Sequence, residues 1–191
     1  CNLDDLLLDS GTLTVAFADP AMTLDVGAAA KGYTAVQAGQ AARERGLTHA
    51  LLNMGGNVYT TGPKADGSAW RVGGENPWPG EDAPQYVQTV ELTGGDSLIV
   101  SGDYQRYFTY EGKRYSHLID LTTGCPAAYY SSVAVYSGPD EGLGDLFSTA
   151  LFCLPPEQSR QVADDNGLAV LWLGTDGEVA AQTDNWPGKA V

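Results

Sequence analysis

Basic residues are scarce in this chain of 191 residues, where 10 Lys and Arg stand against 24 Asp and Glu and the net charge is −14 at pH 7. Such a chain cannot neutralise a phosphate backbone or an anionic lipid surface, which argues against nucleic acid and anionic membranes as partners. Because the overall field repels anions, an anionic ligand must be attracted by a local source, namely a metal ion, a lysine or a helix N-terminus.

Cysteine is also scarce, with only Cys1, Cys125 and Cys153 in the whole chain. An odd count without CxxC or Cys/His spacing excludes a disulfide framework and does not indicate zinc. We expect Cys153 to pack in the core, Cys125 to lie in an exposed turn, and Cys1 to be a chain start inside a domain rather than a lipoprotein cysteine. No apolar run approaches the roughly 20 residues of a membrane helix, and no signal peptide is recognisable.

The remaining composition, with 43% hydrophobic and 18% charged residues, is that of an ordinary globular protein. The length predicts a single domain over 1–191, which could be divided into two lobes at a boundary within the loop-rich segment 63–85. Most strand patterns are joined by short Gly-containing turns, so the predicted class is α+β, with mixed, largely antiparallel sheets and a few packed helices.

The first part of the chain predicts a hairpin, a helix and a further strand. Segments 11–20 and 21–26 are expected to be paired strands on either side of an Asp-Pro turn. An alanine-rich helix follows over 28–46. An apolar strand over 49–55 then leads through a Gly-Gly turn into 57–62. The order strand, helix, strand predicts a right-handed crossover unit.

The rest of the chain continues this alternation of short elements. The further strands are expected at 70–74, 85–94, 96–102, 105–112, 113–120 and 131–138. A helix over 138–156 ends at two prolines, and one stripe of it carries Leu143, Phe147, Ala150 and Leu151. A short helix over 157–167 precedes a final hairpin of 168–174 and 177–183.

Asp145 and Thr149 are the most informative pair of polar residues. They lie four apart in GLGDLFSTALF, so a helix places the carboxylate and the hydroxyl on one face, where both can bind one cation. Oxygen ligands of this kind suit magnesium rather than zinc or copper. The alternative is structural: Asp145 would cap the helix N-terminus, and Thr149 would bond back to its own turn.

The segment LDVGAAAKGY (24–33) offers groups for an anion beside that cation. Asp25 is expected to close a strand, Gly27 to turn, and Lys31 to stand in the first helical turns, where backbone N–H groups lack partners. A lysine there would pair with phosphate oxygens as a point charge. An ordinary strand-to-helix turn with a solvated lysine would have the same sequence. Together with Asp145 and Thr149, this segment predicts a magnesium-dependent enzyme that acts on a diphosphate.

Three other groups of residues could bind ligands or be structural. NMGGN (53–57) is either a ligand cradle or a plain β-turn. SGDYQRYF (101–108) is either a polar ligand site or an amphipathic edge strand. His117 and Asp120 could be a proton-transfer group and its partner, although a histidine in a strand is more often structural. His49 is interpreted as a bystander.

Five segments, taken in order, resemble the motifs of the ApbE family, the FAD:protein FMN transferases. They are LDVGAAAKGY (24–33), LLNMGGN (51–57), SGDYQRYF (101–108), HLIDLTTGCPA (117–127) and DLFSTAL (145–151). Five ordered matches over nearly the whole chain are far more specific than any single glycine turn. The resemblance implies the ApbE-like fold.

The resemblance also implies a reaction. FAD would be cleaved at its diphosphate, FMN would be transferred to a Thr hydroxyl of an acceptor protein of a membrane redox system, and AMP would be released. Magnesium would be bound by the side chains of Asp145 and Thr149 and by the carbonyl of Ala28. Family members act on the extracytoplasmic face of the inner membrane, in the bacterial cell envelope, often as lipoproteins.

By the same resemblance, Asp25 and Lys31 would contact FAD, and the stretch from His117 to Ile119 would line the flavin site. His117 and Asp120 are the candidates for the general base that takes the proton of the acceptor Thr. The family sequence D-P-x-T-G is replaced by Asp-Leu-Thr-Thr-Gly at 120–124, and this loop loses a stiffening proline.

Members of the family carry a substantial region N-terminal to these motifs, which also contacts FAD. We therefore expect this chain to correspond to the C-terminal portion and to lack part of the FAD pocket. The alternative function is a non-catalytic flavin- or nucleotide-binding module. Apolar surface left exposed would favour a homodimer. A role as flavin acceptor is excluded, because Leu151 stands where the modified hydroxyl would have to be.

Overall fold

The structure is a computed structural model that describes residues 2–78, 84–139 and 142–191. A six-stranded antiparallel sheet forms its centre, with strand order β14-β13-β12-β7-β4-β3. Its strands are β3 (Leu51–Met54), β4 (Asn57–Thr60), β7 (Ser97–Gly102), β12 (Ser132–Ser137), β13 (Ala169–Leu173) and β14 (Val179–Gln182). Strands distant in sequence are therefore neighbours, and β7 connects the N-terminal pair β3–β4 to the C-terminal strands.

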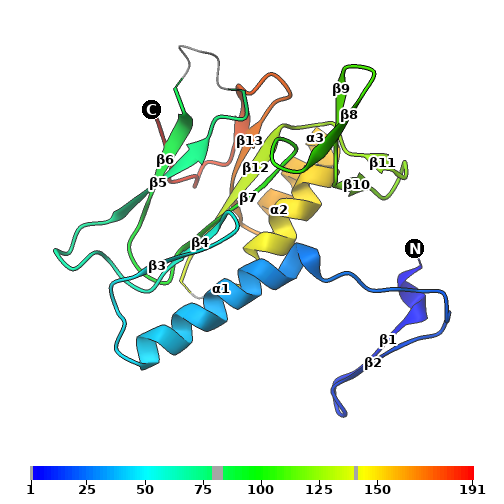
Figure 1. Cartoon of the computed structure of the whole chain (residues 1–191), viewed down its shortest axis with the longest axis horizontal. Helices are drawn as coiled ribbons and strands as arrows, with labels where there is room; N and C mark the ends of the chain where they lie inside the picture. The colour runs from blue at the N-terminus through cyan, green and yellow to red at the C-terminus, as the bar shows by residue number, and fades with distance from the viewer. Residues whose placement is uncertain (1, 79–83, 140–141) are drawn as a thin grey trace.

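The helices pack on one face of this sheet (Figure 1). They are α1 (Gly27–Glu44), α2 (Gly144–Cys153) and α3 (Pro156–Asp165). Side chains alternate along each strand, so Val133 and Val135 of β12 point toward α2 and α3 and join Leu151 and Phe152 in a buried cluster. This buried cluster fixes the position of α2 on the sheet.

A smaller sheet covers the opposite face. Its strands, in the order β15-β6-β5, are β5 (Trp70–Glu75), β6 (Tyr86–Leu92) and β15 (Lys189–Ala190). Val90 and Leu92 of β6 are buried against Leu98 and Leu171 of the large sheet. The two sheets enclose a second apolar core, as in a β-sandwich.

Among the residues that the structure describes, three antiparallel two-stranded ribbons complete the fold. They are β1 (Leu6–Asp9) with β2 (Thr14–Phe17), β8 (Tyr107–Tyr110) with β9 (Lys113–Ser116), and β10 (Ile119–Asp120) with β11 (Cys125–Pro126). A short 3₁₀ turn, η1 (Leu3–Asp5), precedes β1. The β1–β2 ribbon extends away from the body of the molecule (Figure 1).

The predicted α+β class with largely antiparallel sheets is confirmed, as are the helix following residue 27 and the C-terminal hairpin. Cys125 is exposed and Cys153 packs against the α2–α3 cluster, as expected. Burial raises the pKa of the Cys153 thiol to about 11. Cys1 and residues 79–83 of the predicted lobe boundary lie outside the described residues.

The predicted first hairpin is wrong. Strand β2 pairs with the preceding segment β1, and residues 21–26 form no strand. The Asp19 carboxylate accepts a hydrogen bond from the Ala21 N–H (2.8 Å), and this local turn leads the chain directly into α1. Asp25 therefore does not close a strand. The predicted crossover is wrong for the same reason, because β2 and β3 belong to different sheets.

The predicted apolar stripe of α2 is confirmed for Phe147 and Leu151, which pack in the α2–α3 cluster, and is wrong for Leu143 and Ala150. Leu143 is 61% exposed and Ala150 is exposed, whereas Asp145 and Ser148 are buried together with Leu151. The helix is held with two polar residues on its inner face because both find hydrogen-bond partners there. This orientation of α2 creates the polar site described next. Residues 140–141 of the predicted helix lie outside the described residues.

Candidate active site

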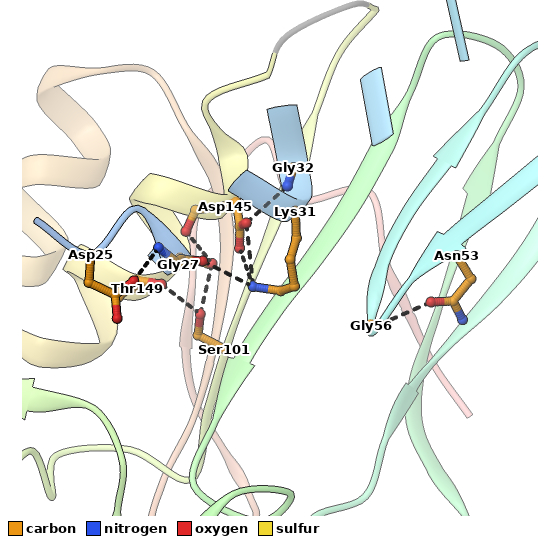
Figure 2. A network of polar contacts seen from close by, with 10 residues as sticks. Asp25, Gly27, Lys31, Gly32, Asn53, Gly56, Ser101, Asp145 and Thr149 are labelled. Atoms are coloured by element: carbon orange, nitrogen blue, oxygen red, sulfur yellow. Dashed lines mark hydrogen bonds and ion pairs between the residues drawn. The ribbon is translucent and has the colours of Figure 1, made fainter. Parts of the chain in front are cut away.

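The Asp145 carboxylate lies at the contact between α1 and α2 and is 1% exposed (Figure 2). Its Oδ2 accepts a hydrogen bond from the Gly32 N–H of α1 at 2.9 Å. The Lys31 ammonium lies 3.3 Å from Oδ1 and 3.5 Å from Oδ2. A buried carboxylate requires such partners. The two segments singled out in the sequence, 24–33 and 145–151, are thus brought together.

Lys31 holds Asp145 only loosely. Charge-assisted N–H···O bonds are typically about 2.7–2.9 Å long, and the contacts of this ammonium with Asp145 and with the Gly27 carbonyl (3.4 Å) are longer. Its side chain is 48% exposed, and its stem runs beside Gly55 in the β3–β4 turn. Lys31 can therefore neutralise Asp145 in the free protein and turn to an anionic ligand when one binds.

Glycines on both helices make this approach possible. A Cβ on Gly32 would lie 2.6 Å from the Cβ of Asp145. A Cβ on Gly144 would lie 2.6 Å from Ile99 Cδ1 and 2.7 Å from Ser137 Oγ, on the sheet below. Side chains at these positions would separate the two helices and lift α2 from the sheet, so the glycines are a requirement of the site.

A chain of hydroxyl groups continues from Asp145 to Thr149 (Figure 2). Ser148 Oγ donates to the Asp145 carbonyl at 2.9 Å and lies 2.9 Å from Ser101 Oγ on β7. Ser101 Oγ in turn lies 3.3 Å from Thr149 Oγ1. Thr149 thus faces β7, and the hydroxyl that bonds back within the helix is that of Ser148. The structural alternative for Thr149 is not supported.

The alternative for Asp145, a helix cap, is wrong. The N-cap position of α2 is Leu143, without a side-chain cap, and the Asp145 carboxylate reaches across to α1 instead. It is Asp25 that accepts a hydrogen bond from an N–H group at the N-terminus of a helix. Its Oδ1 accepts from the Gly27 N–H of α1 at 2.7 Å, and Ala28 is the next residue of that first turn. Asp25 therefore lies two residues before α1, and Ala28 and Lys31 lie in the first two turns of that helix.

The donor set fits magnesium. Within the described ranges there is no group of three or more His, Cys, Asp or Glu that could hold a metal. A cation on Asp145 would instead be bound by a single carboxylate. The neutral oxygen donors that the resemblance assigns are the Thr149 hydroxyl, linked to Asp145 through Ser148 and Ser101, and the Ala28 carbonyl in the first turn of α1. Magnesium is commonly bound by one or two carboxylates while it keeps several waters. The cation would compete with Lys31 for Asp145.

Among the described residues, no hydrogen bond joins His117 to Asp120, the predicted proton-transfer group and its partner. His117 Nδ1 lies 2.9 Å from the Arg106 carbonyl. The Asp120 carboxylate, which is buried, accepts from the Thr122 N–H (2.8 Å) and the Tyr129 hydroxyl (3.1 Å). The Thr122 N–H is the main cause of the lowered pKa of Asp120. Asp120 is therefore a stabilised anion within its own loop rather than the orienting partner of His117.

The loop that follows keeps a closed turn without the family's proline. Gly124 N–H donates to the Asp120 carbonyl at 2.8 Å, and Gly124 has φ +68°, which a glycine adopts without strain. Two hydrogen bonds to Asp120 therefore hold the turn, one from the Thr122 N–H to its side chain and one from the Gly124 N–H to its carbonyl. Ile119, on β10 beside it, is 43% exposed and presents an apolar surface.

The SGDYQRYF segment divides between the site and the scaffold. Ser101 joins the hydroxyl chain, but Asp103 forms an ion pair with Arg114 at 2.9 Å. The Arg114 guanidinium stacks on Trp78 at 3.6 Å. Burial, together with nearby Glu75 and Asp103, raises the pKa of Tyr104 to about 12. Within this segment, Asp103 therefore has a structural role, whereas Ser101 belongs to the site.

Two hollows lie among the described residues, and the second of them borders the contact of α1 and α2. One, of about 340 Å³, lies between the two sheets and reaches Asn53 and Gly56 of the β3–β4 turn. The other, of about 570 Å³, is mainly apolar and lies between α1 and the start of α2, against Tyr33 and Leu146. Sequence analysis missed Gly32 and Ser148; the position of Ser148 three residues after Asp145, on the same helical face, was an available signal.

Comparison with known proteins agrees with the motifs. The model of the ApbE family matches residues 1–172. The chain is 34% identical over 170 residues to the FAD:protein FMN transferase of Klebsiella pneumoniae (strain 342), covering 87% of this chain and 51% of that protein. It is 30% identical over 159 residues to the FAD:protein FMN transferase of Escherichia coli (strain K12), covering 83% and 44%. The chain spans about half the length of these relatives.

Solved structures have the same fold. The ApbE protein of Thermotoga maritima superposes with a TM-score of 0.84 at 28% identity, over 97% of this chain and 59% of that one. The flavin transferase ApbE of Vibrio cholerae gives a TM-score of 0.80 at 26% identity, over 97% and 58%. The predicted family resemblance is thus confirmed.

Proposed function

We propose, since the chain belongs to the ApbE family, that it carries the metal site of a magnesium-dependent flavin transferase. The enzyme would cleave FAD, attach FMN through a phosphoester to a Thr of an acceptor protein, and release AMP. The observation that carries the proposal is the contact of Lys31 and Gly32 with the buried Asp145 carboxylate. That contact supports the proposal because it joins a buried carboxylate, which would bind the metal, to a half-exposed ammonium, which would bind the anion.

Magnesium held by Asp145, Thr149 and the Ala28 carbonyl would neutralise charge on the FAD diphosphate. Lys31 would leave Asp145 and bind a phosphate oxygen, which its exposure and its long contacts favour. The N–H groups at the start of α1 would add a local positive potential in a chain whose net charge is −14. Ser101 and Ser148 would hold the Thr149 hydroxyl in place.

The transfer would be a single displacement at phosphorus. The acceptor Thr oxygen would form a bond to the phosphorus of the FMN moiety, and the bond from that phosphorus to the bridging oxygen would break, so that AMP leaves with that oxygen. The hydroxyl proton would pass to a base. Positioning of the two reacting groups would supply much of the rate enhancement.

His117 is the better candidate for that base. A carbonyl oxygen only accepts hydrogen bonds, so the contact with the Arg106 carbonyl requires Nδ1 to carry the proton. In the neutral ring the other nitrogen, Nε2, then carries a lone pair that can accept the proton of the Thr hydroxyl. Asp120 is less suitable, because its lowered pKa makes it a weak base. The stretch from His117 to Ile119 would line the flavin, and Asp25 would contact FAD beside Lys31.

A non-catalytic flavin- or nucleotide-binding module is the second candidate. Of the proposed site, it would need only the groups that bind an anion, namely Lys31 and the N–H groups at the start of α1. For either function we propose the family's location, the extracytoplasmic face of the bacterial inner membrane. No helix within the described ranges is long and apolar enough to cross a membrane. The exposed apolar side chains of the β1–β2 ribbon, such as Leu8, favour a homodimer.

The decisive experiment is incubation of the chain with FAD, magnesium and a Thr-containing acceptor peptide, with AMP and peptide mass as readouts. We expect AMP release and a mass gain equal to FMN, both abolished by EDTA. FAD binding without turnover would favour the binding module. If FAD neither binds nor reacts, both candidates are wrong for this chain.

Lys31→Ala should affect two ligands in different ways. Loss of the ammonium removes a partner of the FAD diphosphate, so FAD affinity should fall by about tenfold or more, or about 1.4 kcal/mol. Magnesium affinity should not fall, because the cation no longer competes with Lys31 for Asp145. Titration calorimetry with each ligand measures both effects.

The matched control is Lys64→Ala, a lysine that stacks over Trp70 on the opposite side of the large sheet from α1. It should change neither affinity. If Lys31→Ala bound FAD as tightly as the wild type, Lys31 would be an ordinary solvated lysine and not a ligand of FAD.

A further inference from the structure

Asn57, the first residue of β4, is a buried polar side chain without a partner. It is 1% exposed. Among the described residues, neither its carboxamide nitrogen nor its carboxamide oxygen has a hydrogen-bond partner. A buried amide that makes no hydrogen bond destabilises a protein relative to an apolar side chain of the same shape. A buried polar side chain with this cost therefore indicates a role that is specific to its position.

Its position along the strand places it under α1. Tyr59 packs with Ala35 and Val36 on the helix-covered face, whereas Val58 points into the core between the sheets. Side chains alternate along a strand, so Asn57 shares the face of Tyr59. Gly55, two residues earlier, lies beside the Lys31 stem, and Tyr59 packs against Gly39. Asn57 therefore lies beneath the part of α1 that includes Lys31 and Gly32.

The neighbouring strand places it under α2 as well. Val58 is paired with Leu98 and Tyr59 with Ser97, and the same antiparallel register puts Asn57 opposite Ile99. Opposed residues of paired strands share a face. Ile99 touches the position of Gly144, the residue before Asp145. Asn57 thus lies below the contact of α1 and α2, where the Asp145 carboxylate is buried.

We infer that Asn57 is a positioning residue of the cation site and acts through Asp145. This inference rests on the proposed function. When a cation displaces Lys31 from Asp145, the carboxylate loses a hydrogen-bond donor; the Asn57 amide has two N–H donors and can replace it. The carboxamide then gains the partner that it lacks in the free protein, and it fixes the carboxylate for the cation. Polar outer groups commonly orient metal ligands in this way.

The inference predicts opposite effects of Asn57→Leu on stability and on binding. Leucine has nearly the shape of asparagine but no polar group. In EDTA the variant should melt about 2–4 °C higher, because an unpartnered buried polar group is removed. In titration calorimetry with MgCl2 alone, its Kd for Mg²⁺ should rise about tenfold or more, as for loss of other outer-sphere partners. A purely structural role would move the melting temperature alone.

Ser159→Ala is the matched control. The Ser159 hydroxyl is fully buried but partnered, since it donates to the Leu151 carbonyl (2.9 Å) and accepts from Trp172 Nε1 (2.8 Å). Its removal should lower the melting temperature and leave the Kd for Mg²⁺ unchanged. Equal Mg²⁺ affinities in wild type and Asn57→Leu, or a lower melting temperature of Asn57→Leu in EDTA, would overturn the inference. A wild-type chain that binds no Mg²⁺ would overturn the proposed metal site itself, and the inference with it.

Discussion

Asp145→Ala should abolish magnesium-dependent release of AMP from FAD, with a rate loss of about 10³-fold or more. The residue is the carboxylate at the α1–α2 contact and the charged member of the proposed donor set. A metal ion that neutralises a phosphoryl group supplies several kcal/mol of transition-state stabilisation, and a 10³-fold rate loss corresponds to about 4 kcal/mol. The measurement is AMP release with and without magnesium.

The variant should still fold. Lys31 can turn into solvent when Asp145 is lost, because its side chain is half exposed. The Gly32 N–H loses its acceptor, which costs about 1–3 kcal/mol, within the stability of a typical domain. Asp145→Asn separates the two effects, since its amide oxygen still accepts from Gly32 while the charge is removed. It should be more stable than Asp145→Ala and equally inactive.

Asp164→Asn provides the control for charge. Asp164 is an exposed residue of α3 that pairs with Arg160 on the same helix, and its replacement should leave AMP release unchanged. Full magnesium-dependent activity in Asp145→Asn would show that the cation binds elsewhere.

The helical part of the site was predictable from the sequence because its signals are local. Asp145 and Thr149 are four apart, and a helix is sufficient to put both on one face. The burial of Asp145 was not predictable, because it depends on Gly32, more than 100 positions earlier in the chain. The apolar pattern also predicts Leu143 and Ala150 on the inner face of α2. Both are exposed, and Asp145 and Ser148 are buried instead because they form tertiary hydrogen bonds.

Strand pairing was less predictable than strand existence. Segment 11–20 contains the strand β2, but its partner was assigned to 21–26 instead of β1. Both neighbours are apolar, and β-propensity does not choose between them. Asn57 shows the same limit for function: its sequence context indicates a turn followed by a strand, while its burial without a partner follows from the packing of two helices over β4 and β7.

Gly32→Ala is expected to disrupt stability and activity together. Alanine is favoured over glycine in a helix by about 1 kcal/mol, which alone would stabilise α1. The added methyl group would lie 2.6 Å from the Asp145 Cβ, however, and both atoms are fixed to helix backbones. Overpacking of this kind costs about 1–3 kcal/mol, so the net effect should be destabilising. At about 2–4 °C per kcal/mol, the melting temperature should fall by several degrees.

The free energy lost from catalysis should be larger than that lost from folding. Separation of the helices breaks the 2.9 Å hydrogen bond from Gly32 N–H to Asp145 Oδ2 and displaces the carboxylate from its place between α1 and α2. A misplacement of about 1 Å can cost 10²-fold in rate. Gly138→Ala is the control, because a Cβ at Gly138 meets no atom within 4 Å; it should retain activity. If Gly32→Ala matches the wild type in FMN transfer, the close approach of α1 and α2 is not what places the carboxylate for catalysis.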